Sequence, residues 1–374
     1  MRTFWLGLLL ATLLAVQPAI AADMTFKPVA NSTPKGPSEA AGAVIWNHGA
    51  NSYYGVNDVT SSPPATFVNL LRNQGWDLFR LDRPSTAEEL KRSVATLRGH
   101  AEDLKRQGYR KVVLAGQSAG AWISVIVAGQ SDAVYAVIGN APAYRGVNWE
   151  QKQRNGSELF DNLETIKHGR IMLSFFDNDP YDPGGRGVKT AEILTKAAVP
   201  HLVIDLPEGF TGHGAGNGDL FARRFGDCIL AMAADGPVPQ KGACENAAWG
   251  KKPSKDLDIP DSLRVAAPGG KDPAIERYFG KWYGVYPNGR EFLFAIEAVN
   301  GTEVSGVYIS GSMLEGSRGS RSDRKGQFGS DGLIFKTPGQ PTLSYKLRED
   351  GKLDARWDAA DGKGWLAAVM ETLP

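Results

Sequence analysis

The chain has 374 residues, enough for two or three domains with buried cores. Apolar residues make up 42% and charged residues 22%, which excludes a disordered or fibrous protein. The 42 Lys and Arg residues against 41 Asp and Glu leave a formal net charge of +1, so no global basic field favours nucleic acid. The composition therefore predicts a neutral globular protein with no nucleic-acid partner.

The N-terminus has the pattern of a secretory signal peptide. Arg2 precedes an apolar run from Phe4 to Val16, and Ala19-Ile20-Ala21 supplies the small-x-small pattern of a cleavage site. The run is shorter than the ~20 residues that a membrane span needs. We expect residues 1–22 to be removed and the mature chain to be exported, to the periplasm or the medium, without a transmembrane segment. An uncleaved membrane anchor is the alternative.

Short β-branched runs alternate with helical patterns from Ala43 to about Ala234. This alternation predicts an α/β domain over residues 23–235, a doubly wound, mostly parallel sheet flanked by helices. Ser85 and Glu88 form a capping box that predicts the start of a helix. The six predicted strands are Ala43–Trp46, Trp76–Leu81, Lys111–Ala115, Val134–Gly139, Ile171–Phe175 and His201–Leu206.

Residues 236–274 are rich in Pro, Gly, Lys and Asp, which predicts a linker. The chain has two cysteines, Cys228 and Cys244. In an oxidising compartment they favour one disulfide that closes a loop at the start of the linker, worth roughly 3 kcal/mol. Two free buried thiols are the alternative.

Residues 275–374 change to strict alternation of apolar and polar side chains, as in Leu343, Tyr345 and Leu347. About eight strands in a meander are expected, closing into a small antiparallel β-barrel that leaves no exposed edge. A basic stretch, Arg318 to Lys325, is interpreted as a solvated loop. The dipeptides that predict hairpin turns are Asn288-Gly289, Asn300-Gly301, Asp331-Gly332, Asp350-Gly351 and Asp361-Gly362.

The segment with the strongest chemical signal is Gly116-Gln117-Ser118-Ala119-Gly120, which follows an apolar strand and precedes a helix. The flanking glycines allow a turn so sharp that the serine is exposed at the carboxyl edge of the sheet. This context predicts Ser118 as a nucleophile; a structural serine in a tight turn is the alternative.

A serine hydroxyl needs a base and an acid to activate it. Of the five histidines, His213 lies in a glycine-rich loop after the last predicted strand and is the predicted base. Three carboxylates follow the strand that ends near Phe175, and Asp179 is the predicted acid, with Asp177 and Asp182 as alternatives. The same carboxylates lack the Gly and Glu placement of a recognised calcium loop.

Acyl transfer also needs donors to the oxyanion. The N–H of Ala119, directly after the nucleophile, is one candidate. The second is expected from the turn that begins at His48 after the first strand, with Ala50 favoured and Gly49 or Asn51 as alternatives. For His48 itself we expect a role in orienting this loop.

The order of these features, a strand followed by His-Gly, then Gly-x-Ser-x-Gly, a post-strand Asp and a late loop His, resembles the α/β-hydrolase family. The resemblance covers residues 40–235. It implies an α/β-hydrolase fold and a serine hydrolase that forms an acyl-enzyme on a small-molecule acyl substrate, without a metal or an organic cofactor. Only about 30 residues separate the fourth and fifth strands, which argues against a large lid. Aromatic side chains that could line the substrate pocket are Tyr53, Tyr54, Tyr144 and Trp149.

The C-terminal region has a weaker likeness. Gly280-Lys281-Trp282 is similar to the entry strand of lipocalin-like barrels, which implies an apolar ligand cavity; a packed barrel without a ligand is the alternative.

Three functions are compatible with these patterns. An exported serine esterase is favoured. A peptidase or amidase would use the same catalytic residues, and a binding protein on a hydrolase scaffold would keep the fold without turnover. The sequence does not indicate the oligomeric state.

Overall fold

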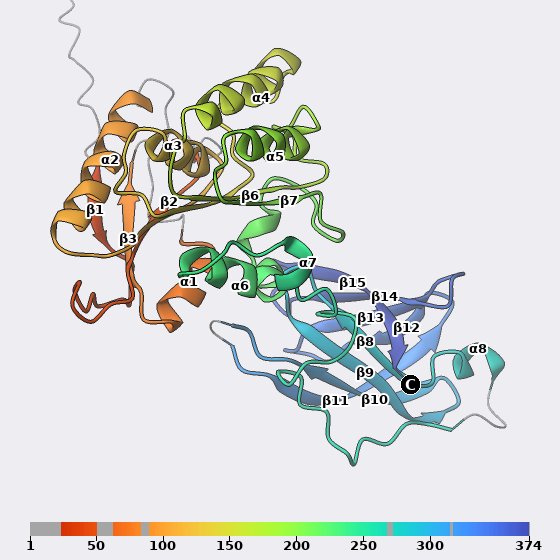
Figure 1. The fold of residues 1–374 in the computed structure, drawn as a ribbon. Coiled ribbons are helices and arrows are strands. Elements are labelled where there is room, and N and C mark those ends of the chain that lie inside the picture. The colour runs from red at the N-terminus through yellow and green to blue at the C-terminus, as the bar shows by residue number, and fades with distance from the viewer. Residues whose placement is uncertain (1–23, 51–62, 84–89, 268–271, 315–316, 374) are drawn as a thin grey trace, which may run out of the picture.

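The computed structural model describes residues 24–50, 63–83, 90–267, 272–314 and 317–373. A sheet flanked by helices is followed along the chain by a β-barrel (Figure 1). The predicted fold class, a doubly wound and mostly parallel α/β sheet followed by a small antiparallel barrel, is confirmed.

The sheet has seven strands in the order β1-β3-β2-β4-β5-β6-β7, and every neighbouring pair except β1 with β3 is parallel. All six predicted strands are present within a few residues of their expected bounds. The sequence reading missed β1, a four-residue edge strand whose side chains are mostly exposed and carry no apolar run. The strands are β1 (Thr25–Pro28), β2 (Ala43–Asn47), β3 (Asp77–Asp82), β4 (Val112–Gln117), β5 (Ala136–Asn140), β6 (Arg170–Phe175) and β7 (His201–Asp205).

Helices cover both faces of this sheet (Figure 1). On β2, Val44 and Trp46 pack toward one face, and Ala43 and Ile45 toward the other. Because both faces are buried, these strands are apolar throughout instead of alternating. The helices are α1 (Thr66–Asn73) and α6 (Asp219–Ala233) on the first face, and α2 (Leu90–Arg106), α3 (Ala119–Ala128), α4 (Trp149–Glu164) and α5 (Arg186–Lys196) on the second. The predicted capping box, Ser85 and Glu88, lies outside the described residues.

The barrel consists of eight antiparallel strands that close on themselves when the last pairs with the first. In all five predicted turn dipeptides the glycine has a positive φ, between 60° and 98°, and each joins two successive strands. The strands are β8 (Lys281–Val285), β9 (Glu291–Asn300), β10 (Glu303–Ser310), β11 (Ser320–Gly329), β12 (Gly332–Phe335), β13 (Thr342–Leu347), β14 (Leu353–Asp358) and β15 (Trp365–Leu373).

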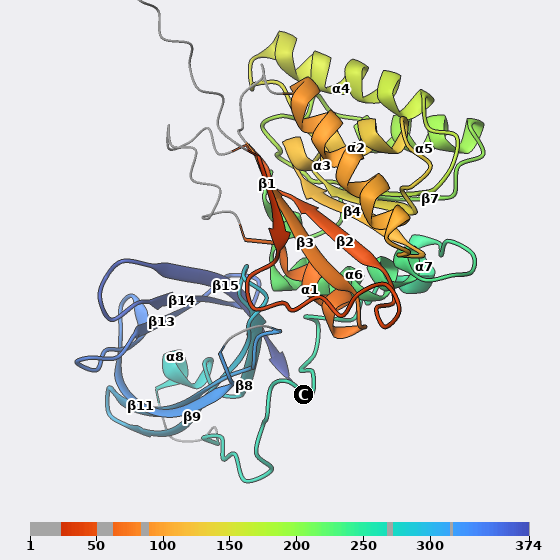
Figure 2. The ribbon, with the colours of Figure 1, turned by 90° about the vertical axis from the view of Figure 1, so that its left-hand side faces the viewer.

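Large aromatic side chains fill the barrel interior. Tyr286 stacks on Phe292 with ring centroids 3.9 Å apart, and Phe294 stacks on Tyr345 at 4.0 Å. The short helix α8 (Pro273–Glu276) adds Ile275 to the same buried cluster and covers one end of the barrel (Figure 2). These contacts favour the packed barrel over the lipocalin-like cavity.

The interpretation of Arg318 to Lys325 as a solvated loop was wrong. Most of this stretch belongs to β11, and Arg324 is only 7% exposed, because alternate side chains of the strand point into the barrel. The Arg324 guanidinium donates to the side-chain oxygen of Gln340, and its Nε donates to Ser322 Oγ at 3.0 Å. A cluster of charges in the sequence therefore does not by itself identify a loop.

Much of the segment predicted as a linker packs against its neighbours. It contains the short helix α7 (Lys241–Cys244). Further along, Leu257 and Leu263 are buried against the outer face of the barrel, in contact with a cluster that includes Leu293 and Ile309. These contacts attach residues 257–263 to the barrel surface.

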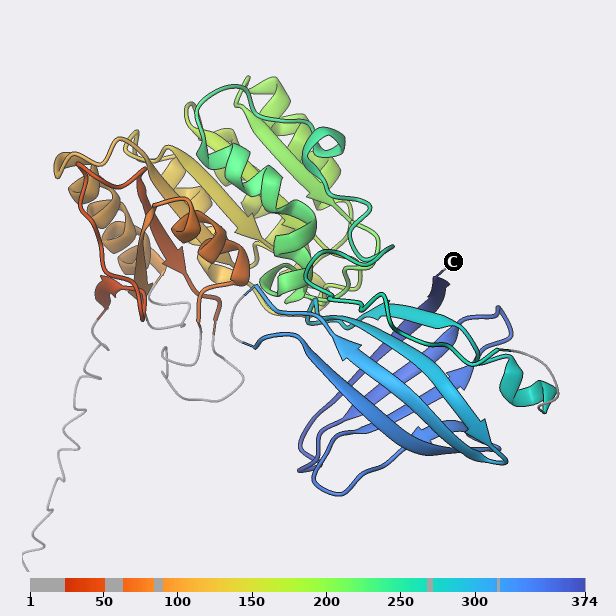
Figure 3. The same ribbon diagram turned by 90° about the horizontal axis from the view of Figure 1, so that it is seen from below.

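Helix α6 contacts the segment between β10 and β11 of the barrel (Figure 3). The barrel lies on the same side of the sheet as α1 and α6 (Figure 1). Asp219, the first residue of α6, accepts a hydrogen bond from the Leu314 N–H at 2.9 Å. One turn later, Arg223 donates to the Ser312 carbonyl at 2.9 Å and pairs with Asp256. The end of α6 that meets the barrel is thus the end that follows the His213 loop.

Cys228 on α6 and Cys244 on α7 form a disulfide, as predicted. The bond joins residues 16 positions apart and holds α7 against α6. Both cysteines are buried, and Cys228 is fully so.

Replacing both cysteines by alanine is expected to lower the free energy of unfolding of the sheet domain by about 3 kcal/mol, because the open loop gains conformational freedom in the unfolded chain. Urea titration followed by the helical circular-dichroism signal measures this change. The oxidised wild type and the wild type with dithiothreitol are the controls. Identical midpoints for the double variant and the oxidised protein would contradict a stabilising role.

Candidate active site

Ser118 lies in the sharp turn between β4 and α3. Its backbone has φ 55° and ψ −122°, a conformation that side-chain-bearing residues adopt only under strain. A Cβ on Gly116 would collide with the backbone of Gly120, and a Cβ on Gly120 would collide with the Asn47 carbonyl of β2. Both glycines are thus required for β4, α3 and β2 to approach so closely, as the sequence pattern predicted. Ser118 is 8% exposed.

His213 lies beside Ser118, in the loop between β7 and α6. Its Nε2 is 2.7 Å from Ser118 Oγ, and its Nδ1 is 2.9 Å from Asp179 Oδ1 and 3.0 Å from Oδ2. A proton on Nδ1 satisfies the carboxylate, and this tautomer leaves the Nε2 lone pair to accept the Ser118 hydroxyl proton. The structure thus brings together Ser118, His213 and Asp179, the three side chains predicted from the sequence.

Asp179 is the carboxylate of the three candidates that contacts His213. The side chain of Asp179 is fully buried. The Asp182 carboxylate is instead paired with Arg186 at 2.9 Å. Arg186 also lies 3.8 Å from Asp179, so a buried guanidinium offsets the negative charge of both carboxylates. Asp177 accepts from Asn178 Nδ2, and its main-chain carbonyl holds the Gly212 N–H of the histidine loop at 2.7 Å.

The predicted oxyanion donors flank Ser118. Ala119 is the first residue of α3, where an N–H has no acceptor within its own helix. On the other side, a Cβ on Gly49 would lie 3.2 Å from the Ser118 Cβ, so the turn that carries Gly49 and Ala50 borders the serine. Ala50 is exposed. Asn51 lies outside the described residues.

His48 is buried beneath this turn. None of its described hydrogen bonds is made to Ser118. Its Nδ1 lies 2.6 Å from the Gly49 carbonyl, and its Nε2 accepts the Arg83 N–H at 3.2 Å. Burial, reinforced by the positive charge of Arg83, lowers the pKa of His48 to about 4. The ring is therefore neutral at pH 7, with its proton on Nδ1, and ties the turn to the end of β3. This arrangement fits the expected orienting role.

Of the four aromatic residues predicted to line the substrate pocket, the structure describes Tyr144 and Trp149. Tyr53 and Tyr54 lie outside the described residues. Trp149, the first residue of α4, is 72% exposed, and Tyr144 packs against Trp122 with ring centroids 6.5 Å apart. The sequence reading missed Tyr181, whose ring lies 4.3 Å from the His213 ring. Its position two residues after Asp179 was the signal that could have indicated it.

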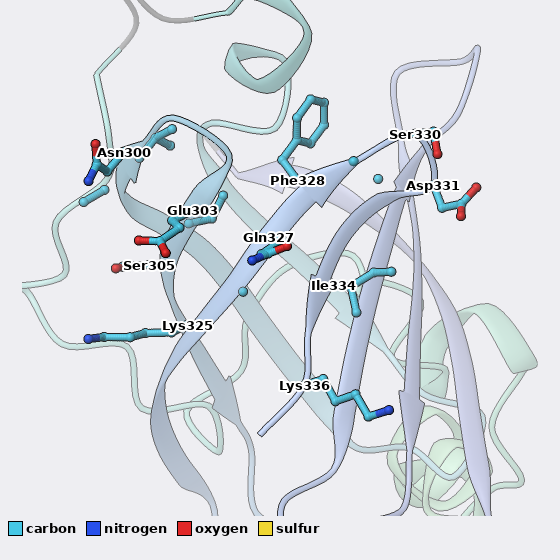
Figure 4. A pocket seen from close by; sticks show the side chains of 16 residues that line it. Asn300, Glu303, Ser305, Lys325, Gln327, Phe328, Ser330, Asp331, Ile334 and Lys336 are labelled. Carbon is cyan, nitrogen blue, oxygen red and sulfur yellow. The ribbon is translucent and has the colours of Figure 1, made fainter. Parts of the chain in front are cut away.

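The barrel has a groove of its own, of about 860 Å³, on strands β9 to β12 (Figure 4). Its walls carry Glu303, Lys325, Gln327 and Lys336, and Phe328 lies at one end. All of its lining residues belong to the barrel, so it is separate from the Ser118 site.

The described ranges contain no group of three or more His, Cys, Asp or Glu side chains placed to hold a metal ion. None of their helices is long and apolar enough to cross a membrane.

Comparison with known proteins gives similarity in structure only. No family model matches the sequence, and no curated protein matches it. A truncated carbohydrate esterase from gut microbiota is 13% identical over 57% of this chain and 91% of its own, with a TM-score of 0.42. The monoacylglycerol lipase of Paleococcus ferrophilus is 14% identical over 57% and 99%, also at 0.42. A puromycin-hydrolysing peptidase of Mycobacterium tuberculosis is 16% identical over 56% and 37%, at 0.40. These values are too low to assign an activity.

The pKa of His48 predicts a pH dependence of stability. Because the folded-state pKa, about 4, lies below the ordinary 6.5, the unfolded chain binds the proton more tightly between these values. The contribution of His48 is therefore complete above pH 6.5 and is lost as the pH falls through 4, by about 3 kcal/mol.

His48→Gln keeps a donor and an acceptor but does not titrate. Urea unfolding of the wild type and this variant at pH 7.5, 5.5 and 4.5 isolates the effect, since other groups titrate alike in both. The stability advantage of the wild type is expected to shrink as the pH falls. A constant difference would contradict the lowered pKa.

Proposed function

We propose that this protein is an exported serine hydrolase that cleaves a carboxylic ester through an acyl-enzyme intermediate. The observation that carries the proposal is the hydrogen-bonded line from Ser118 through His213 to the buried Asp179, with both imidazole nitrogens engaged at 2.7 to 3.0 Å. A structural serine would not require a histidine and a buried carboxylate aligned in this way.

Acylation begins when Ser118 Oγ attacks the carbonyl carbon of the ester and His213 Nε2 takes the hydroxyl proton. The new C–O bond produces a tetrahedral intermediate whose oxyanion would be held by the N–H groups of Ala119 and Ala50. The bond to the alcohol oxygen then breaks, and His213 returns its proton to that oxygen. Asp179 stabilises the imidazolium that exists between these transfers.

Deacylation repeats the sequence with water. His213 takes a proton from the water molecule as its oxygen attacks the acyl carbon, and the bond to Ser118 Oγ breaks with return of the proton to the serine. The carboxylic acid leaves and the starting enzyme is restored. No redox step or external group carrier is needed.

Export is supported by the signal-peptide pattern at the N-terminus and by the disulfide between Cys228 and Cys244, a bond that persists in oxidising compartments.

A peptidase or amidase that uses the same catalytic residues is the second candidate function. The third candidate is a non-catalytic binding protein on this scaffold, in which the three aligned side chains would have no catalytic role.

The nucleophile is tested by labelling the mature protein with a fluorophosphonate, which needs an activated serine but no knowledge of the substrate. An adduct on Ser118, located by mass spectrometry, is expected, and Ser118→Ala should lower turnover of an activated ester at least about a thousand-fold. Ser131→Ala, which changes a serine in the loop after α3, serves as the control. A folded wild type with neither adduct nor turnover would favour the binding protein.

Ester and amide cleavage are separated by a matched pair of substrates with the same acyl group, one with an alcohol and one with an amine as the leaving group. We expect kcat/KM for the ester to exceed that for the amide by more than their difference in uncatalysed reactivity. The reverse preference would identify a peptidase or amidase. Both activities should disappear together in Ser118→Ala.

A further inference from the structure

Two side chains at the carboxyl edge of the sheet hold the loop that carries His213. Gln117 is the last residue of β4 and Asn140 the last of β5, and the two are paired in register. Gln117 Nε2 donates to the His213 carbonyl at 3.2 Å, and Asn140 Nδ2 donates to the Gly216 carbonyl at 2.7 Å. The loop that carries the base is therefore held from β4, which leads into Ser118, and from the neighbouring β5, in addition to the bond between His213 and Asp179.

Asn140 is hydrogen-bonded both to the main chain of Ser118 and to the loop that carries His213. Its main-chain carbonyl accepts the Ser118 N–H at 2.9 Å, while its side chain holds the loop three residues after His213. One residue thus determines the distance between the serine and the segment that bears the histidine.

Stabilisation of the fold does not explain why residue 140 is an asparagine. It is 1% exposed, and its Oδ1 has no hydrogen-bond partner within the described residues. A buried amide with an unpaired acceptor costs free energy that an apolar side chain of similar size would not. What the amide supplies is its one directed bond to the Gly216 carbonyl.

The loop itself requires such support. Five glycines between Gly209 and Gly218 leave its backbone with unusual freedom in the absence of contacts. Gly216 lies so close to the strand ends that a Cβ there would meet the Asn140 amide and the Phe176 ring. The absence of a side chain thus allows the close approach that the hydrogen bond then fixes.

We propose that Asn140, assisted by Gln117, is a positioning residue that keeps the His213 imidazole aligned between Ser118 and Asp179. The inference rests on the proposed function for its kinetic consequence, although the alignment itself is a property of the folded protein. Neither amide contacts the reacting atoms. Each acts through the loop.

The chain offers a matched control at the opposite end of the same strand. Tyr135 precedes β5, and its hydroxyl donates to the Ala234 carbonyl at 2.7 Å, just after α6 ends. Asn140 and Tyr135 therefore tie the two ends of the same loop–helix unit to the two ends of β5, each through a bond to a main-chain carbonyl. The Tyr135 hydroxyl also accepts from Arg170 at 3.3 Å and lies 3.5 Å from Asp235 Oδ1. Tyr135→Phe removes these contacts, all of them at the end of β5 that is remote from Ser118.

The kinetic test compares Asn140→Ala and the near-isosteric Asn140→Asp with Tyr135→Phe. For both Asn140 variants we expect kcat and the fluorophosphonate labelling rate to fall about ten-fold or more, with KM changed less than two-fold. Tyr135→Phe should keep wild-type values of all three. Gln117→Leu should show a smaller loss, and combining it with Asn140→Ala should cost less than the product of the two single effects, because both bonds hold one loop.

A spectroscopic readout separates this inference from the proposed function. A histidine Nδ1 proton shared with a buried carboxylate gives a far-downfield proton resonance, assigned here by its loss in His213→Gln. We expect the signal to weaken or broaden in Asn140→Ala and to persist in Tyr135→Phe, whether or not any substrate is turned over. An unchanged resonance and labelling rate in folded Asn140 variants would overturn the positioning role. A normal resonance in a wild type that never labels would instead count against the hydrolase.

Discussion

The close approach of α3 to the ends of β4 and β2 is the constraint on which the candidate site depends. Hydrogen atoms in place of side chains at Gly116 and Gly120 allow it, and the chain between them is forced into the strained conformation of Ser118. This turn brings the serine to the carboxyl edge of the sheet and places the Ala119 N–H beside it. The packed helices and strands around the turn supply the free energy that maintains the strain.

The other groups reach Ser118 because parallel strands all end at the same edge. The loop after β2 brings Gly49, the loop after β6 brings Asp179, and the loop after β7 brings His213. Three loops that are well separated in sequence thus meet at one edge, within hydrogen-bond distance or van der Waals contact of their neighbours. Loop variation at this edge can change the substrate without disturbing the sheet below it.

The six parallel strands and the barrel could be predicted from the sequence because each has a local pattern of apolar residues and turns. Ser118, His213 and Asp179 could be selected because each follows a predicted strand in a recognisable chemical context. The elements that the sequence reading missed lack such patterns. Strand β1 is short and mostly exposed, and the buried environment of Arg324 depends on pairing across the barrel. The hydrogen bond of Asn140 joins it to Gly216, 76 residues further along the chain, which no local pattern encodes. Tyr181 could have been indicated only by its place two residues after Asp179, and its contact with the His213 ring is likewise made across the chain.

The closure of the barrel has a consequence for the order in which the chain can fold. Strand β15 pairs with β14 on one side and with β8 on the other, so the barrel cannot close until β15 has been synthesised. The sheet that bears Ser118 is complete about 170 residues earlier, at the end of β7. A chain that lacks the nine residues of β15 would retain the whole sheet yet leave one edge of β8 and one edge of β14 unpaired, a state prone to intermolecular strand pairing. We therefore expect loss of β15 to cause aggregation, while the sheet that bears Ser118 keeps all of its strands.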